Sequence, residues 1–80
     1  MFAASAASRD SEFTEFVESA TSSLGRTAYL LTGDRELAAD LVQEALVRTY
    51  VAWRRVRRGE ALGYARRTLV NLSIDRWRRR

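Results

Sequence analysis

Apolar side chains recur at three- and four-residue steps along most of this chain, and no proline interrupts them. This spacing gathers apolar residues on one side of an α-helix, so it predicts an all-α fold with three helices. We expect the helices at about residues 11–31, 35–53 and 60–80, in one small domain with a modest core. Residues 1–10 are small and polar and are predicted to form a disordered tail, with Ser11 as the first N-cap.

The stretch Thr-Gly-Asp at 32–34 is the clearest boundary between helices. Gly33 suits the left-handed conformation that ends many helices, and Asp34 suits the N-cap of the next helix. Glu36 follows in the first turn, where a negative charge stabilises the helix dipole. Gly59 lies in an arginine-rich connector and marks the second boundary. We therefore expect a tight turn before the second helix and a basic loop after it.

The predicted second helix has two different faces. One is apolar and is expected to face the core; it comprises Ala38, Leu41, Val42, Ala45, Leu46, Thr49, Ala52 and Trp53. The other carries two valines among acids and an amide: Glu36, Asp40, Gln43, Glu44, Val47 and Val51. An apolar centre with a polar rim is typical of a protein–protein interface, whereas a merely solvated face is the alternative. Because the patch is acidic, an interface here would bind a basic partner and repel DNA.

Charge is divided unevenly along the chain, and every basic residue is an arginine. Residues 1–47 hold three arginines and eight acids, a net charge of −5. Residues 48–80 hold eleven arginines and two acids, a net charge of +9. A polyanion would be attracted to the second half and repelled by the first. The chain is therefore expected to have two chemically different partners.

The predicted third helix leaves a narrow stripe exposed, made of Tyr64, Arg67, Asn71, Asp75 and Arg78. Arginine binds phosphate, tyrosine stacks on unpaired bases, and asparagine reads base edges. The stripe therefore favours a nucleic acid with at least one base out of the stack, and arginines that merely keep the helix soluble are the alternative. Asp75 is expected to pair with Arg78 or Arg79. Arg76 is expected to extend along the core edge or to pair with an acid on a neighbouring helix.

The residue types that are absent disfavour other function classes. The chain has no histidine, cysteine or lysine, and thus lacks the usual zinc ligands, disulfides and activated nucleophiles. We predict no enzyme, no metal, no cofactor and no small-molecule substrate. No apolar run approaches the roughly 18 residues of a membrane span, and the N-terminus does not resemble a signal peptide. A cytoplasmic protein is expected, with a basic helix lying on an anionic membrane as the weaker alternative.

Two stretches of the chain, LTGDRELAADLVQEALVRTY and YARRTLVNLSIDRWRRR, together resemble region two of the sigma factors of bacterial RNA polymerase. The resemblance covers residues 11–80 and is greatest to the extracytoplasmic-function (ECF) group, in particular its actinobacterial SigE-like type. It rests on Asp-Leu-Val-Gln-Glu in the second helix and on Asn-x-x-x-Asp-x-x-Arg-Arg in the third. It implies a compact three-helix domain of the sigma2 type that acts in transcription initiation.

The resemblance implies two binding sites. The second helix would dock on the clamp helices of the polymerase's largest subunit through Ala39, Asp40, Gln43, Glu44, Val47 and Arg48. The last helix and the loop before it would recognise and melt the promoter minus-ten element, holding the non-template strand single-stranded with one base flipped into a pocket. The implied DNA-binding residues are Arg57, Arg58, Gly59, Tyr64, Arg67 and Asn71, with phosphate contacts from Arg66, Arg78, Arg79 and Arg80.

The chain departs from the family in two places. Many relatives have a proline at the start of the last helix, where this chain reads Arg-Arg-Gly-Glu-Ala, a difference that bears on loop conformation and base preference. Region four, which reads the minus-thirty-five element, does not follow Arg80, so we expect an excised domain or a truncated protein. An anti-sigma protein is a further partner that the resemblance implies. A small helical module that binds nucleic acid nonspecifically is the alternative function.

Overall fold

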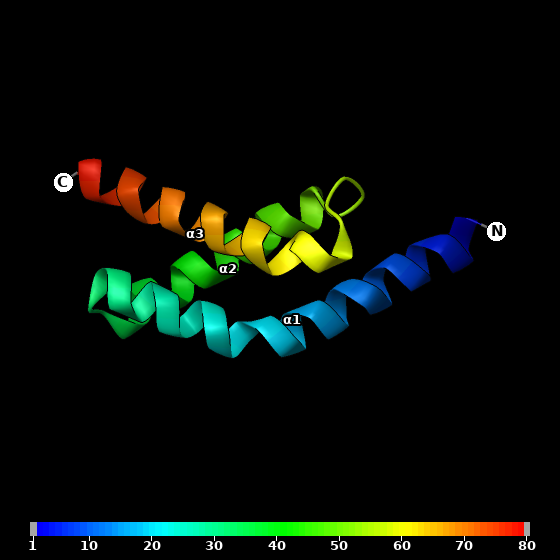
Figure 1. Ribbon diagram of the computed structural model, residues 1–80, viewed down its shortest axis with the longest axis horizontal. Coiled ribbons are helices and arrows are strands. Elements are labelled where there is room, and N and C mark those ends of the chain that lie inside the picture. Colours follow the sequence, from blue (N-terminus) through cyan, green and yellow to red (C-terminus); the bar gives the residue numbers. More distant parts are fainter. Residues whose placement is uncertain (1, 80) are drawn as a thin grey trace.

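The computed structural model describes the backbone of residues 2–79 and the side chains of residues 8–79. Three long helices account for most of it: α1 (Phe2–Thr32), α2 (Arg35–Val51) and α3 (Ala61–Arg78). A short 3-10 turn, η1 (Arg58–Glu60), precedes α3. Figure 1 shows α2 running back along α1, and α3 returning in the direction of α1. No strand occurs in residues 2–79, and the predicted all-α, three-helix fold is confirmed.

The first helix is longer than its apolar pattern predicted. Residues 2–10, expected as a disordered tail, are helical, and Ser11 lies inside α1 instead of at its N-cap. This segment is rich in alanine, the residue with the highest helix propensity. In addition, the Tyr50 hydroxyl donates a hydrogen bond of 2.9 Å to the Asp10 carboxylate, which ties this part of α1 to α2. Met1 lies outside the described residues.

The turn between α1 and α2 has the predicted geometry. Gly33 has a φ of +69°, in the left-handed region that favours glycine, and its amide donates to the carbonyl of Tyr29 at 2.8 Å. Asp34 is the N-cap of α2, because its Oδ1 accepts hydrogen bonds from the amides of Glu36 and Leu37 at 2.9 and 3.1 Å. These contacts end one helix and begin the next in a tight turn, so that α1 and α2 pack side by side.

One apolar core joins the three helices. Leu24 of α1, Leu41 of α2 and Leu69 of α3 are fully buried within it. Each such leucine stabilises the fold by about 1.5–3 kcal/mol relative to an exposed position. The predicted core face of α2 is buried apart from Leu46, which is partly exposed and packs against the core. Thr49 is buried too, and its hydroxyl donates to a backbone carbonyl one turn back at 2.8 Å.

A separate cluster of aromatic rings holds the end of α2 against the N-terminal half of α1. Trp53 lies one residue beyond Ala52, the C-cap of α2, and is only 3 % exposed. The ring of Phe13 meets it edge-on with centroids 5.0 Å apart, and Phe16 lies 5.3 Å from it. Phe13 also lies 4.9 Å from the ring of Tyr50. Each pair contributes about 0.5–1.5 kcal/mol beyond its buried area. The cluster therefore determines where the loop of residues 52–57 begins.

Candidate functional site

The outward face of α2 is exposed, as its pattern predicted. Ala39, Asp40 and Gln43 are exposed side chains on this face, in the turns that precede two exposed valines. Val47 is 57 % exposed and Val51 is 77 % exposed. Two apolar side chains in this setting bury their surface only when another molecule covers them. The face thus has the apolar centre and polar rim of a docking surface.

Glu44, on the same face, is engaged in two ion pairs. Its Oε2 accepts a hydrogen bond from Arg48 Nη2 at 3.1 Å, and its Oε1 lies 3.7 Å from Arg76 Nη2 of α3. The predicted pairing of Arg76 with an acid on a neighbouring helix is confirmed. All three side chains are partly exposed, so the pairs add at most about 1 kcal/mol each to stability. Their main effect is to hold the carboxylate and Arg48 in defined positions.

An apolar groove of about 590 Å³ runs beside this face, between α1 and α2. Ala39 and Gln43 line it from α2 together with Val42, and Gly25 and Tyr29 line it from α1. Sequence reasoning missed the contribution of α1, because periodicity identifies the faces of each helix but not the spacing between two helices. The groove extends the apolar surface of the α2 patch onto a second helix.

The loop before α3 and the first turns of α3 enclose a second hollow, of about 470 Å³. The predicted DNA-binding residues Gly59, Tyr64 and Arg67 all line it. The structure adds five lining residues that sequence reasoning did not single out: Ala52, Arg55, Val56, Glu60 and Gly63. Arg55 belongs to the arginine-rich connector, and that run was the one feature of the sequence that could have identified it. The hollow combines cationic groups, an aromatic ring and small residues that leave space.

Arg58, also predicted to bind DNA, is engaged within the protein. Its guanidinium lies 4.1 Å from the centroid of the Trp53 ring. Its Nη1 donates to the backbone carbonyls of Trp53 and Val56 at 3.1 and 3.0 Å, and its Nε donates to Glu12 Oε2 at 3.4 Å. Arg57, next to it, is exposed, and no side-chain hydrogen bond or ion pair involves it among residues 8–79. The two neighbouring arginines therefore have different surroundings.

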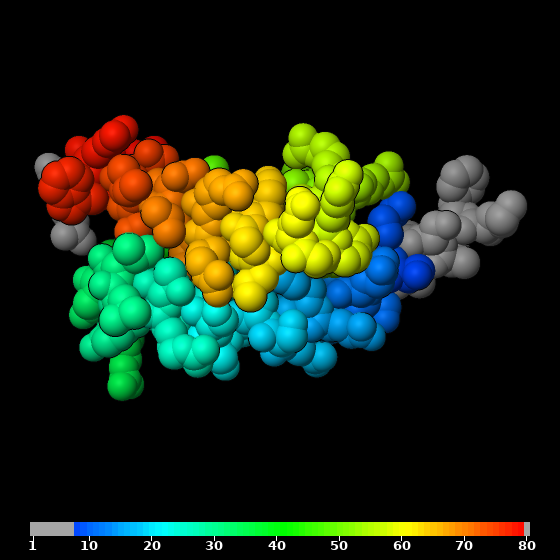
Figure 2. All heavy atoms as spheres, in the orientation of Figure 1, coloured from blue at the N-terminus to red at the C-terminus, as the bar shows by residue number. Residues whose placement is uncertain are grey.

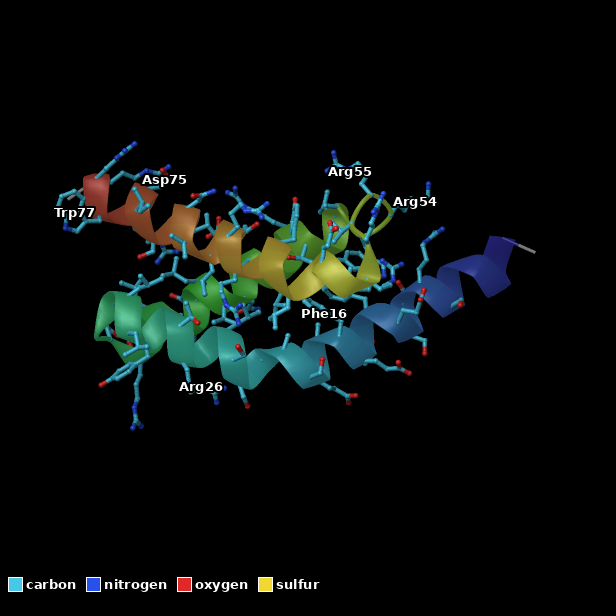
Figure 3. All side chains as sticks on the ribbon, viewed as in Figure 1. Phe16, Arg26, Arg54, Arg55, Asp75 and Trp77 are labelled. Carbon is cyan, nitrogen blue, oxygen red and sulfur yellow. The ribbon has the colours of Figure 1, made fainter. Side chains whose placement is uncertain are left out.

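The remaining predicted DNA contacts are spread along α3. Asn71 is exposed one turn beyond Arg67, and Arg78 and Arg79 are exposed at the end of the helix. Arg66 lies on the side of α3 that faces α1, where its Nη2 donates to Ser23 Oγ at 2.9 Å. Arg80 lies outside the described residues. Figure 3 shows Arg54 and Arg55 in the loop near the start of α3, and Asp75 and Trp77 near its other end.

The predicted ion pair of Asp75 is not found. Within the described part of the chain, no carboxylate oxygen of Asp75 lies within 4.0 Å of Arg78 or Arg79, and the amide of Arg79 bonds instead to the backbone carbonyl of Asp75 at 3.2 Å. Because all three side chains are exposed, water solvates their charges well and the attraction between them is weak. The arginines at the end of α3 are therefore not held in place by Asp75.

One hydroxyl near the loop has a shifted pKa. Asp10 accepts a hydrogen bond from Tyr50 and also places a negative charge beside it, and both effects raise the pKa of that phenol.

Among the described residues, no cluster of three or more acidic, histidine or cysteine side chains is arranged to hold a metal ion. In the same part of the chain, no helix is both long and apolar enough to cross a bilayer.

Comparison with known proteins gives matches of one kind. The family model described as sigma-70 region 2 matches residues 16–80. The RNA polymerase sigma-E factor of Streptomyces coelicolor is 39 % identical over 70 residues, which cover 86 % of this chain and 40 % of that protein. The RNA polymerase sigma-E factor of Streptomyces avermitilis is 40 % identical over 70 residues, with 86 % and 39 % covered. This chain therefore spans about two fifths of the relatives that it matches. No solved structure matches it.

Proposed function

Because this chain belongs to the sigma-70 region 2 family, we propose that it acts in bacterial transcription initiation. In this proposal, α2 binds core RNA polymerase, and α3 with the loop before it binds the promoter minus-ten element as single-stranded DNA. The observation that carries the DNA half is the hollow lined by Gly59, Tyr64 and Arg67. The chain itself performs no chemical step, and it would work in the cytoplasm, where bacterial transcription takes place.

The polymerase-binding surface is the outward face of α2. Ala39, Asp40, Gln43, Glu44, Val47 and Arg48 would contact the clamp helices of the largest subunit. Support comes from the exposed apolar centre at Val47 and from the two acids beside it. A basic partner would be steered to this face by charge, and burial of the valine would then contribute to affinity. DNA is repelled by the same acids, so the two partners of the chain are kept to separate helices.

The DNA-binding surface begins at the hollow before α3. Its volume of about 470 Å³ falls within the roughly 300–1,000 Å³ of sites that hold small organic molecules, a size that suits a single base. Flipping a base costs a few kcal/mol. Stacking on the Tyr64 ring, worth about 1–3 kcal/mol, offsets much of that cost. Arg67 would neutralise a nearby phosphate, and Asn71, one turn further along, would read the edge of a neighbouring base.

Phosphate contacts would continue along α3 toward its C-terminal end. The 18 residues of α3 span on the order of 27 Å, long enough to contact several nucleotides of a single strand. Arg57 at the loop, Arg66 near the start of α3, and Arg78 to Arg80 at its end would bind the backbone of the non-template strand. An anti-sigma protein that covers either surface would block initiation, and this partner is part of the proposal.

The proposal can be tested with a randomised pool of single-stranded DNA selected on the immobilised chain. We expect the selection to enrich one sequence, and the enriched strand to bind at least about tenfold more tightly than its scrambled version. Tyr64→Ala should abolish this preference, whereas the matched control Tyr29→Ala, outside the hollow, should retain it. Binding of the chain to a clamp-helix fragment is measured in parallel, and the proposal expects this binding to occur.

The same experiment distinguishes the alternative function. Equal affinity for all strands, together with no binding to the clamp-helix fragment, would show a small helical module that binds nucleic acid nonspecifically. That result would overturn the proposal, because salt-dependent contacts to phosphate alone explain such behaviour.

A further inference from the structure

We propose that Arg58 is a positioning residue for base recognition, and that it shapes the wall of the hollow instead of binding DNA. We further propose that Glu12 of α1 contributes to this role by holding the guanidinium in place. The inference rests on the proposed function of the hollow. It reassigns a predicted DNA contact that differs from the others among residues 8–79, because the side chain of Arg58 has partners on several sides within the protein itself.

The contacts of Arg58 join the two ends of one short segment of the loop. Its Nη1 donates both to the Trp53 carbonyl, at 3.1 Å, and to the Val56 carbonyl, at 3.0 Å. Carbonyls that follow the last turn of a helix have no partner in the helix itself, and a charged donor satisfies them well. The central carbon of the same guanidinium lies over the Trp53 ring, 4.1 Å from its centroid, within range of a cation–π contact. The segment 53–56 is thereby held as a closed turn.

This segment is a wall of the hollow. Arg55 and Val56 line it, and so does Gly59 directly after Arg58. The backbone of the loop is also bonded to itself, with the amides of Arg55 and Val56 donating to the Ala52 carbonyl at 2.9 and 3.2 Å. Arg58 adds the side-chain bonds that keep this turn against Trp53. A site that reads one base needs walls in fixed positions, because binding affinity falls when the site must first be ordered.

The N-terminal half of α1 supports the wall from behind. Glu12 accepts a hydrogen bond from Arg58 Nε at 3.4 Å, and Phe13 packs edge-on against the Trp53 ring. Figure 2 shows the yellow-green residues of the loop and η1 lying against the blue part of α1. The ion pair is exposed and weak as a source of stability. It does, however, fix the direction of a guanidinium whose other donors hold the loop, and this links α1 to base recognition.

Arginine and lysine make different predictions at this position. A phosphate contact depends chiefly on the positive charge, so Arg58→Lys would largely preserve it. The loop contacts need an extended group that lies over a ring while it donates to two carbonyls, and the compact ammonium of lysine cannot reproduce them. The experiment therefore compares Arg58→Lys, Arg58→Ala, Glu12→Gln and the neighbouring Arg57→Ala in the full chain. Each is titrated with the enriched and the scrambled strand over a range of salt concentrations.

For a positioning residue, Arg58→Lys and Arg58→Ala should lower affinity for the enriched strand by about tenfold, with little change for the scrambled strand. Glu12→Gln should act in the same direction with a smaller effect. The Arg58→Lys variant should leave the salt dependence unchanged. Arg57→Ala, at a phosphate contact, should weaken both strands and reduce the salt slope by about 0.7. If Arg58→Lys binds like the parent chain, or Arg58→Ala behaves like Arg57→Ala, the inference is wrong.

Hydrogen exchange provides a readout that needs no DNA. The amides of Val56 and Glu60 bond to backbone carbonyls of the loop at 3.2 and 2.8 Å. In Arg58→Lys they should exchange faster than in the parent chain, while amides in the middle of α2 are unchanged. Unchanged exchange at Val56 and Glu60 would overturn the role of Arg58 even if the DNA results were as expected. Absence of strand preference in the parent chain, with faster loop exchange in the variant, would instead overturn the proposed function.

Discussion

The carboxylate of Glu44 in α2 and the guanidinium of Arg76 in α3 lie 3.7 Å apart and bridge the two helices at the surface. In addition to the contacts of α2 and α3 in the apolar core, this pair links the surfaces of the helix proposed to bind polymerase and the helix proposed to bind DNA. The bridge is formed by partly exposed side chains and is therefore a contact that a partner can compete for.

Reversing the charge at this position should separate binding from folding. Glu44→Arg places a cation beside Arg48 and Arg76 and opposite a basic partner, so we expect affinity for a clamp-helix fragment to fall at least roughly a hundredfold. The free energy of unfolding should change by only about 1 kcal/mol, because the lost pairs are exposed. Fluorescence anisotropy and thermal unfolding measure the two quantities. The control is Glu18→Arg, a charge reversal at an exposed residue of α1. Equal affinity of both variants for the clamp-helix fragment would contradict the assigned interface.

The apolar centre of the same face gives a second prediction. Val47 is 57 % exposed, so Val47→Ser should leave the free energy of unfolding within about 0.5 kcal/mol. Affinity for the clamp-helix fragment should fall roughly tenfold, since a valine that a partner buries contributes about 1.5 kcal/mol or more. Leu30→Ser provides the matched control, because Leu30 is 84 % exposed on α1 outside the patch. A similar loss of affinity in both variants would indicate nonspecific apolar contact.

Base reading and phosphate binding on α3 should respond differently to mutation. Asn71→Ala should cost about 1–3 kcal/mol for the enriched strand and much less for strands altered at the position it reads. Arg79→Ala should weaken all strands alike and reduce the salt slope. Titrations of both variants against a panel of single-base changes test this difference. If Asn71→Ala weakens every strand equally, Asn71 does not read a base.

The pair of Tyr50 and Asp10 predicts a dependence on alkaline pH. The pKa of Tyr50 is raised in the folded state, first by its hydrogen bond to Asp10 and second by the charge of that carboxylate. The folded state thus holds the phenolic proton more tightly than the unfolded state. The resulting stabilisation is complete below the ordinary tyrosine pKa of about 10, and it is lost as pH rises through the raised value.

Asp10→Asn should therefore lower the pKa of Tyr50 toward its ordinary value. Phenolate absorbance during an alkaline titration measures it, and the difference between the parent chain and Tyr50→Phe isolates the contribution of this residue. An unchanged Tyr50 titration in Asp10→Asn would mean that the bond between α1 and α2 does not form in solution.

Much of the fold was predictable because its determinants are local. Gly33 and Asp34 act through the conformation and hydrogen bonds of their own turn, and the two faces of α2 follow from helical spacing alone. Family membership, read from motifs in α2 and α3, is confirmed by the match over residues 16–80. The start of α1 was predicted wrongly, because a residue that favours N-caps can also lie inside a helix when the residues before it favour helix, as the alanines before Ser11 do. The hydrogen bond between Asp10 and Tyr50, which ties this part of α1 to α2, joins residues far apart in sequence, so helical periodicity could not predict it.

The sequence by itself determined the number of helices, the buried side of α2, the acidic and basic halves, and the family. Only the tertiary structure decided which charges are free to meet a partner. Arg57 and Arg58 are chemically identical neighbours in the sequence, and both are exposed, yet the Arg58 guanidinium lies against Trp53 and two carbonyls, whereas Arg57 makes no such contact among residues 8–79. The physical reason is that a side chain's partners depend on the packing of α1, α2 and the loop together, and no local pattern encodes that spacing.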